Sequence, residues 1–390
     1  MKILIVDDQQ LVLLSLEKLL SSSGYEVISA DNIMDAIARY DSEKPNLIIV
    51  DINMSNLSNA ESLNESGSGL EVVKYIKQIK KDSTPVMVLS GNTDEEVIIK
   101  AFDLGIDDYM KKPLSLSEIG ARVKRLIGST IEKSVTEKTN SKERYIQNKC
   151  IGVVIPCYNE ETRLSSNEFK SFVHKNLGYH LCFVNDGSKD NTLAVLNELT
   201  KGKEEYISVY DCIKNGGKAE AVRLGMLHLA KQNQFDYIGF LDADLSTNFD
   251  DFQDLADTIY NSKYKLVFGS RISRMGADIT KQSARVLISK TINYIIIKIL
   301  GMKINDTQCG AKIMTKEIIE KTFSEKFVTK WIFDVEIFMR MKKIYGSAKT
   351  QELILEKPLN RWIHMDGSKL SFKDSVKIMG QIGQIALHYR

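Results

Sequence analysis

The sequence has no apolar run long enough to cross a membrane. A membrane-spanning helix needs roughly 20 apolar residues, and the most apolar stretch, residues 291–300, has half that length and contains Lys298. The N-terminus, MKILIVDDQQ, lacks the pattern of a signal peptide because two acidic residues end its short apolar run. The sequence therefore predicts a soluble, cytoplasmic protein, which could still bind the inner face of a membrane from the cytosol.

Cysteine and net charge are also low. The 5 cysteines among 390 residues are odd in number and lack metal-ligand spacing, so they indicate reduced thiols and argue against a disulfide framework. The formal net charge of +2 gives no general case for binding nucleic acid. A length of 390 residues is too great for one ordinary core and predicts two domains.

Short apolar runs alternate with helical patterns in both halves of the chain. The runs are KILIV, YEVIS, NLIIV, PVMVL and DDYM in the first half, and IGVVIP, HLCFVND, YISVYD, YIGFLDAD and KLVFGSR in the second. Strands that alternate with helices form parallel, doubly wound sheets. Residues 129–149 are poor in apolar residues and rich in charge. We therefore predict an α/β domain over 1–128, a charged linker over 129–149 and a second α/β domain over 150–390.

Three carboxylates at strand ends predict a metal site in the first domain. Asp7 and Asp8 follow the first apolar run, and Asp51 follows the third. The carboxyl ends of parallel strands meet at one edge of the sheet, where α/β proteins place their chemistry. Converging carboxylates suit Mg²⁺, which prefers oxygen ligands. Lys112 and Ser90 are expected at the same edge, where the lysine can pair with a carboxylate or a phosphoryl oxygen.

On these residues, positions 1–128 resemble the receiver domain of two-component response regulators, which has a flavodoxin-like doubly wound fold. The resemblance implies that Asp51 accepts a phosphoryl group from a cognate histidine kinase or another phosphodonor. Phosphorylation would draw a hydroxyl toward the new charge and reorient an aromatic ring. The implied Mg²⁺ site consists of Asp7, Asp8, Asp51 and Asn53, and the implied switch of Ser90, Tyr109 and Lys112.

The first domain departs from the receiver pattern just after Asp51. Receivers usually have Met-Pro and then a glycine, whereas Met54 is followed here by Ser55 and a Ser/Asn-rich stretch that delays the glycine to Gly69. The simplest interpretation is a surface loop over residues 55–68. In a second interpretation this loop slows dephosphorylation or presents a surface to a partner.

The second domain has its own polar residues at strand ends. Asp242 and Asp244 follow the run YIGFL, and two carboxylates at i and i+2 can hold a divalent ion that bridges a diphosphate. Asp186 follows another strand, where it could accept a hydrogen bond from a base or a ribose. Lys218 follows a compact Gly-Gly turn. The GxxxxGK[ST] spacing of a P-loop is absent, so this is not a P-loop site.

Residues 151–370 resemble the inverting family 2 glycosyltransferases, which have the Rossmann-like GT-A fold and bind nucleotide sugars. The segments DTQCG (306–310), KWIFDVE (330–336) and GSKL (367–370) are most similar to dolichyl-phosphate β-glucosyltransferases and other polyprenyl-phosphate hexosyltransferases. The resemblance implies transfer of a hexose from a nucleoside diphosphate sugar, aided by Mg²⁺ or Mn²⁺. The implied nucleotide-sugar residues are Pro156, Tyr158, Glu160, Asp186, Lys218, Asp242, Arg271 and Lys369, and the implied metal residues are Asp242 and Asp244.

Asp334 is the first candidate for a catalytic carboxylate and Glu336 the second. Positions i and i+2 of a helix diverge by about 200°, so we do not expect both to face one sugar. A buried helix cap or a salt-bridge partner is the alternative role for each. Ser246 stands where some polyprenyl-phosphate mannosyl enzymes have a glutamine ligand, so a metal here would be held more weakly or completed by water.

The acceptor decides whether a general base is needed. A polyprenyl phosphate is ionised near neutral pH, because its second pKa is about 6, and cationic positioning by Arg271 or Arg285 would then matter more. A hydroxyl acceptor needs a carboxylate base. The basic, isoleucine-rich segment 281–304 suits a helix in a membrane interface, and it equally suits a buried helix or an oligomer surface.

Together the two clusters predict a response regulator whose output is a glycosyltransferase. Phosphorylation of Asp51 would change transferase activity, dimerisation or placement at a membrane. One alternative is a transferase-like domain that only binds a nucleotide sugar or scaffolds partners. In a second alternative the enzyme is active and the receiver is a constitutive dimerisation module. The expected partners are a histidine kinase or other phosphodonor, a nucleotide sugar, a polyprenyl phosphate at a membrane surface and a second copy in a homodimer.

Overall fold

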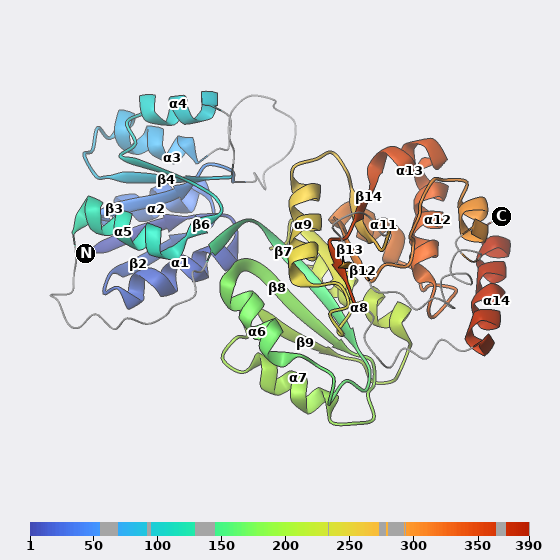
Figure 1. The fold of residues 1–390 in the computed structure, drawn as a ribbon. Coiled ribbons are helices and arrows are strands. Elements are labelled where there is room, and N and C mark those ends of the chain that lie inside the picture. The colour runs from blue at the N-terminus through green and yellow to red at the C-terminus, as the bar shows by residue number, and fades with distance from the viewer. Residues whose placement is uncertain are drawn as a thin grey trace. The chain divides into compact units, whose positions relative to one another are not determined.

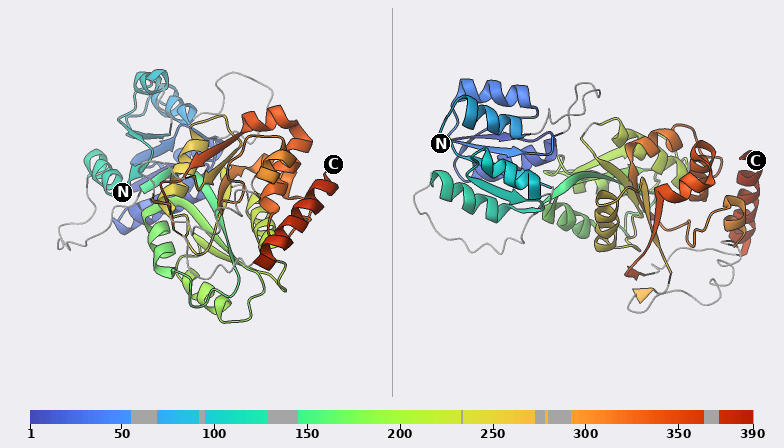
Figure 2. Two further views of the ribbon diagram at one scale, coloured as in Figure 1. Left: turned by 45° about the vertical axis from the view of Figure 1, so that its right-hand side comes forward. Right: turned by 90° about the horizontal axis from the view of Figure 1, so that it is seen from above.

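The chain divides into two compact units in a computed structural model. The model describes residues 1–54, 69–91, 95–128, 145–232, 234–272, 278–279, 292, 294–363 and 372–389. The first unit contains residues 1–150 and 173–178, and the second contains residues 151–172 and 179–390. Each unit has a central sheet with helices packed beside it (Figure 1, with further views in Figure 2).

The sheet of the first unit has five strands in the order β2-β1-β3-β4-β5, and all neighbours are parallel. This order is that of the flavodoxin-like doubly wound fold, so the predicted fold class is confirmed. Each apolar run predicted from the sequence contributes a strand. The bounds are β1 Lys2–Val6, β2 Glu26–Ala30, β3 Leu47–Asp51, β4 Val86–Ser90 and β5 Asp108–Lys111.

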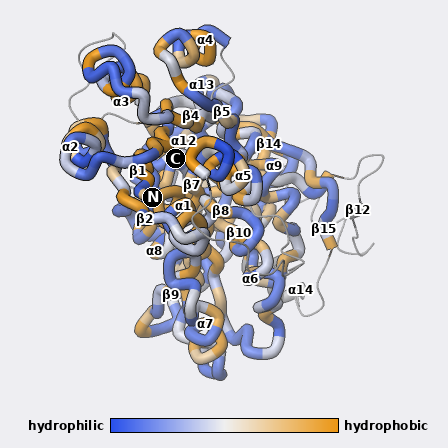
Figure 3. Tube along the Cα trace, turned by 90° about the vertical axis from the view of Figure 1, so that its left-hand side faces the viewer, coloured by the Kyte–Doolittle hydropathy of each residue, from blue (hydrophilic) through white to orange (hydrophobic). Residues whose placement is uncertain are grey.

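Helices cover both faces of this sheet, which explains why its strands are apolar without alternation. Helix α1 packs against α5, and α2 packs against α3 on the other face (Figure 1). Hydrophobic and hydrophilic residues alternate along the outer helices, as α2 and α4 show in Figure 3. The helices are α1 Gln10–Ser22, α2 Ile33–Glu43, α3 Leu70–Lys74 with the π-helical η1 Tyr75–Ile79, α4 Glu95–Asp103 and α5 Leu116–Ile127.

The second sheet is mixed, with the order β14-β11-β13-β10-β7-β8-β9. Strand β13 runs antiparallel between β10 and β11, while the pairs β10/β7, β8/β9 and β11/β14 are parallel. The predicted α/β class therefore holds here too. The bounds are β7 Tyr145–Cys157, β8 Asn176–Asn185, β9 Ile207–Asp211, β10 Tyr237–Leu241, β11 Leu266–Ser270, β13 Ala311–Thr315 and β14 Ile354–Pro358.

Helix α8 lies close against the second sheet because Gly225 has no side chain. A Cβ at this position would lie 2.6 Å from Cγ1 of Val154 on β7. This close packing fixes the place of Lys218 at the start of α8. The remaining elements are α6 Ser166–Lys175, α7 Thr192–Thr200, α8 Lys218–Ala230, α9 Phe249–Tyr260, α11 Lys316–Phe323, α12 Phe333–Tyr345, α13 Ser347–Leu353, α14 Phe372–His388, and the paired short strands β12 Asp278–Ile279 and β15 Arg361–Trp362.

The end of the predicted linker is a strand. Residues 129–144 lie outside the described part of the chain, but β7 already begins at Tyr145. Its first residues pair antiparallel with β6, Leu114–Ser115, in the register Leu114 to Ile146. Ile146 is fully buried, and this burial stabilises the strand at the end of the predicted linker. Strand β7 thus begins in the first unit and ends in the second.

Half of segment 281–304 can be assessed, from residues 292 and 294–304, because 281–291, with Arg285, and 293 are not among the described residues. Ile292, Ile296 and Leu300, four positions apart, are all buried, while Tyr294 is exposed. This pattern favours the buried-helix alternative over the membrane-interface alternative. Among the described residues no helix is both long and apolar enough to span a bilayer.

Candidate functional sites

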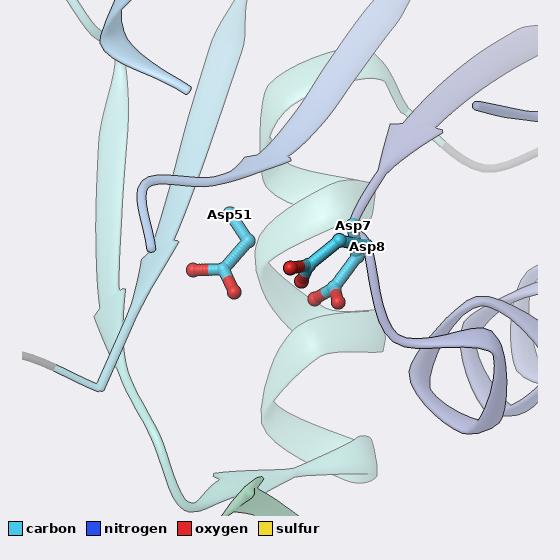
Figure 4. A group of neighbouring side chains, drawn as sticks. All are labelled: Asp7, Asp8 and Asp51. Atoms are coloured by element: carbon cyan, nitrogen blue, oxygen red, sulfur yellow. The ribbon is translucent and has the colours of Figure 1, made fainter. Parts of the chain in front are cut away.

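The three carboxylates of the first unit meet at the carboxyl edge of its sheet. One oxygen of each of Asp7, Asp8 and Asp51 lies within 4.8 Å of the others, and Asp7 and Asp8 point from the end of β1 toward Asp51 (Figure 4). Burial raises the pKa of Asp7 to about 7, against the opposing effect of Lys112. Three oxygens at this spacing fit a hard divalent cation, since a cation would relieve the repulsion between buried carboxylates.

Lys112 is buried between two of these carboxylates. Its Nζ lies 2.9 Å from Oδ2 of Asp7 and 3.0 Å from Oδ2 of Asp51. Burial disfavours the ammonium group, but Asp7 and Asp51 outweigh it, so the pKa of Lys112 is raised. The lysine therefore stays charged in direct contact with Asp51.

The remaining predicted residues of this site are Asn53 from the metal set and Ser90 and Tyr109 from the switch. The backbone N–H of Asn53 donates to Oδ1 of Asp51 at 3.1 Å, and Oγ of Ser90 donates to Oδ1 of Asn53 at 3.2 Å. Ser90 is buried at the end of β4, next to β3. Tyr109 is half-buried on β5, opposite Val88 of β4.

The chain returns from residues 55–68, which lie outside the described residues, directly onto the backbone of Asp51. A Cβ on Gly69 would lie 1.9 Å from the carbonyl oxygen of Asp51, and the N–H of Gly69 donates to Ile52 O at 3.1 Å. Only glycine fits this position. The position of this glycine in the sequence therefore has a steric reason at the end of β3.

The second site centres on Asp242, which follows β10. Nζ of Lys218, the first residue of α8, lies 2.5 Å from Oδ1 of Asp242. The N–H of Asp242 donates to Gly310 O at 3.1 Å. Asp244 is half-buried, and its Oδ1 accepts a hydrogen bond from the N–H of Ser246 at 3.0 Å. The structure therefore brings Lys218, Asp242 and the DTQCG turn together.

Glu160 lies in the same negatively charged region. Burial is the main cause that raises the pKa of Glu160, and Arg163 lowers it. The nearby carboxylates raise this pKa further; they are Asp244, Asp190 and Asp242. This concentration of negative charge would stabilise a divalent cation. Among the described residues, however, the only three acidic residues with oxygens within 4.8 Å of one another are Asp7, Asp8 and Asp51. Near Glu160, Pro156 is half-buried in the last residues of β7 and Tyr158 is exposed.

Asp186 holds the Gly-Gly turn that precedes Lys218. Its two carboxylate oxygens accept hydrogen bonds from the N–H groups of Gly216 at 2.7 Å and Gly217 at 2.9 Å. Burial raises the pKa of Asp186, while these two N–H groups lower it. The carboxylate that the sequence assigned to a base or ribose thus accepts from the protein's own turn in this structure.

Arg271 forms a two-pronged ion pair with Asp306, the first residue of DTQCG. Nε lies 2.7 Å from Oδ2 and NH2 lies 2.8 Å from Oδ1. Burial opposes ionisation of Asp306, but Arg271 lowers its pKa to about 2. The guanidinium also lies 5.3 Å from the ring centroid of Trp362. The sequence predicted phosphate contact for Arg271 and gave Asp306 no role; Lys369 lies outside the described residues.

The two candidate catalytic carboxylates belong to different networks. Asp334, in the first turn of α12, is buried and forms an ion pair with Nζ of Lys312 at 2.8 Å. Burial raises the pKa of Asp334, whereas Lys312 and Lys218 lower it. Glu336 is fully buried and accepts from the N–H of Val328 at 2.9 Å and from the Tyr389 hydroxyl at 2.8 Å.

The sequence did not predict the contact of Lys312 with Asp334 or that of Tyr389 with Glu336. Lys312 is a charged residue within the otherwise apolar strand AKIMT, which is a usable signal for a paired buried ion. For Tyr389 the sequence contains no comparable signal, because nothing around a tyrosine at the end of the chain indicates that its hydroxyl contacts a buried glutamate.

Two family models match the chain. The response regulator receiver domain matches residues 3–124, and glycosyl transferase family 2 matches residues 152–323. The second range contains Glu160, Asp186, Lys218, Asp242 and Asp244.

Similar proteins include two named dolichyl-phosphate beta-glucosyltransferase. The one from Drosophila melanogaster is 32% identical over 236 residues, which cover 57% of this chain and 69% of that protein. The one from Dictyostelium discoideum is 31% identical over 262 residues, covering 63% and 76%. A solved structure of glucosyl-3-phosphoglycerate synthase from Mycobacterium tuberculosis, with Mn²⁺, uridine-diphosphate and glucosyl-3-phosphoglycerate, matches with a TM-score of 0.46 and 18% identity, over 62% of this chain and 80% of that one.

Proposed function

The chain belongs to the family 2 glycosyltransferases and carries a response regulator receiver domain in its N-terminal part, and we propose that it transfers glucose from a nucleoside diphosphate glucose to a polyprenyl phosphate, with inversion. The observation that carries this proposal is the similarity to two proteins named dolichyl-phosphate beta-glucosyltransferase, each covered over more than two thirds of its length. In this proposal residues 150–390 form the catalytic domain and residues 1–128 the regulatory domain.

In the donor site, Asp242 and Asp244 would hold Mg²⁺ or Mn²⁺ together with the diphosphate, and Glu160 would add to the negative potential. When bound, the cation would neutralise charge that develops on the leaving diphosphate. Lys218 supplies a cation from the chain itself, since its Nζ already contacts Asp242. Asp186 keeps the turn before Lys218 in place by accepting hydrogen bonds from the N–H groups of Gly216 and Gly217. Pro156 and Tyr158 would line the nucleotide.

Asp334 is the proposed catalytic carboxylate, because it is buried and the charges of Lys218 and Asp242 both act on its pKa. Glu336 instead accepts hydrogen bonds from Val328 and Tyr389. A phosphate acceptor needs no base near neutral pH, since its second pKa is about 6. Asp334 would then orient the sugar. With a hydroxyl acceptor it would take the proton. Arg271 and Lys369 would meet the phosphate groups, with Arg271 kept in place by Asp306.

We also propose that phosphorylation of Asp51, with Mg²⁺ bound by Asp7, Asp8, Asp51 and the Asn53 carbonyl, changes transferase activity. Support comes from the contact of Lys112 with Asp51 and from chain connectivity. Strand β6 starts two residues after Lys112 and pairs with the first residues of β7. The last residues of β7 include Pro156 in the transferase unit. A shift at Lys112 therefore has a short covalent and hydrogen-bonded route into β7.

The test uses the full-length protein with UDP-, GDP-, ADP- and dTDP-glucose, a polyprenyl phosphate in liposomes, and Mg²⁺ or Mn²⁺. We expect one donor to yield glucosylated lipid and free nucleoside diphosphate, and Asp244→Asn to abolish both. Transfer only to sugar or protein hydroxyls would contradict the acceptor class. Thermal stabilisation by a donor without any turnover would instead favour a domain that only binds the nucleotide sugar.

Regulation is tested by comparing the protein with and without acetyl phosphate. We expect the phosphodonor to change the initial rate of the wild-type protein and to leave Asp51→Asn unchanged. Equal wild-type rates under both conditions would remove the switch and would favour a receiver that acts only as a dimerisation module.

A further inference from the structure

Lys312 is a charged side chain at the centre of the second sheet. It lies on β13, opposite Phe240 of β10 and Phe268 of β11, and it is fully buried. Its Nζ is 5.5 Å from the Phe240 ring centroid and 5.9 Å from that of Phe268. Burying an ammonium group costs several kcal/mol unless close partners compensate for the lost water. Its partners therefore indicate what the residue is for.

Three oxygens surround the ammonium group. Nζ donates to Thr307 O at 2.9 Å and to Cys309 O at 2.7 Å, and it forms the ion pair with Oδ1 of Asp334 at 2.8 Å. An ammonium group has three N–H donors. Two of them are donated to backbone carbonyl oxygens, and the ammonium group is in ion-pair contact with Asp334, so we assign Lys312 a role toward other residues of the protein and not toward a substrate.

Both sets of partners lie next to the donor site. The turn 307–310 ends in Gly310, whose missing side chain leaves room for Asp242. Asp334 stands in the first turn of α12. Lys312 thus links the backbone that supports Asp242 to the side chain of Asp334.

We propose that Lys312 is a positioning residue for sugar transfer, which holds the Asp334 carboxylate and the 307–310 turn in one geometry. The inference rests on the proposed function, in that it takes Asp242 and Asp334 as parts of the transferase site. It adds a residue that the sequence motifs did not suggest.

Charge balance supports this role. The charged groups that face Asp334 are Lys312 from β13, Lys218 from α8 and Asp242 after β10. Of the two lysines, Lys218 is already in contact with Asp242. Without Lys312, the buried Asp334 carboxylate would lose its closest cation and would be free to move toward Lys218. That movement would disturb the Lys218–Asp242 pair.

The test compares Lys312→Met with Lys357→Met in the full-length protein. Lys357 is a matched control, because it is a partly buried lysine on β14 that pairs with Asp254 at 2.6 Å, outside the set around Asp334. With the donor that the wild-type protein consumes, we expect kcat of Lys312→Met to fall roughly 100-fold while KM for the donor changes less than about threefold. Lys357→Met should keep both values. An unchanged kcat in Lys312→Met would overturn the proposal.

A double variant separates positioning from a general loss of structure. If Lys312 acts through Asp334, then Lys312→Met combined with Asp334→Asn should be within about threefold of Asp334→Asn alone. Independent, additive losses would overturn the proposal. The double variant also removes both buried charges, so it should fold even if Lys312→Met does not. If both variants unfold, Lys312 is required only for folding and the proposal is wrong.

A readout without turnover keeps this inference distinct from the proposed function. Hydrogen–deuterium exchange should become faster at residues 307–310 and in the first turn of α12 in Lys312→Met, and should stay unchanged there in Lys357→Met. Unchanged exchange in Lys312→Met would overturn the inference even if the wild-type protein is active. A wild-type protein that is inactive with every donor would overturn the proposed function while leaving the exchange result to decide on Lys312.

Discussion

Gly310 and Asp242 approach each other so closely that no side chain fits between them. A Cβ on Gly310 would lie 2.0 Å from Oδ2 and 2.3 Å from Cγ of Asp242. The N–H of Asp242 donates to the carbonyl of the same glycine at 3.1 Å. The glycine of DTQCG is therefore needed for space beside a carboxylate. It ties the turn that directly precedes β13 to the end of β10.

We predict that Gly310→Ala displaces the Asp242 carboxylate and lowers the transfer rate by about 100-fold, because shifts near 1 Å are costly in an active site. Initial rates of nucleoside diphosphate release measure the effect. Gly383→Ala on α14 is the control, since a Cβ there would meet no atom within 4 Å. An active Gly310→Ala protein would show that Asp242 can be repositioned without loss.

Mg²⁺ binding at Asp7, Asp8 and Asp51 should weaken as the pH falls through about 7. The pKa of Asp7 is raised to about 7, chiefly by burial, so below that pH the cation must displace a proton to bind. Mg²⁺ affinity falls with falling pH because the carboxylate form of Asp7 is the ligand and the protonated form does not bind the cation. Calorimetric titration with Mg²⁺ from about pH 8 to about pH 6 measures this affinity. The Asp244→Asn variant is used so that the proposed metal site of the second unit does not contribute. Equal affinity over this range would contradict the prediction.

Lys112→Met should destabilise the first unit by about 3–5 kcal/mol in the absence of divalent cations, because it leaves Asp7 and Asp51 buried without their ammonium partner. Denaturant unfolding followed by circular dichroism measures the loss. Mg²⁺ should restore part of it. Lys77→Met is the control: its ion pair with Asp107 is near the surface and should contribute at most about 1 kcal/mol. Similar losses in both variants would argue against a special role for Lys112.

Tyr389→Phe should destabilise the second unit by about 1–3 kcal/mol, because the buried Glu336 loses the hydroxyl that donates to it at 2.8 Å. The same hydroxyl accepts from Nε of Arg340 at 2.8 Å. Thermal unfolding of the full-length protein measures the change. Leu387→Ala, in the last turn of α14 and largely exposed, should have little effect. Equal melting temperatures for wild type and Tyr389→Phe would rule out a contribution from this hydroxyl.

Much of the architecture could be predicted from the sequence. Apolar runs that alternate with helical patterns predict parallel strands, and the first sheet follows from that periodicity. In the second sheet the same runs give β7 to β11, whereas β14 and the antiparallel β13 were not among them. The approach of Asp7, Asp8 and Asp51 could be predicted as well, because a residue that follows a parallel strand is delivered to a known edge of the sheet. The same argument places Asp242 and Asp244 after β10.

Only the tertiary structure decided which charges meet. Arg271 pairs with Asp306, Asp186 pairs with the turn at Gly216 and Gly217, and Lys312 pairs with Asp334. These partners are far apart in sequence, and their meeting depends on how β13 runs antiparallel between β10 and β11 and on how closely α8 and α12 pack. Periodicity says which face of an element is buried, but not which residue of another element lies opposite. The sequence by itself therefore determined the fold class and the cluster of Asp7, Asp8 and Asp51, while three-dimensional packing selected the partner of each buried ion.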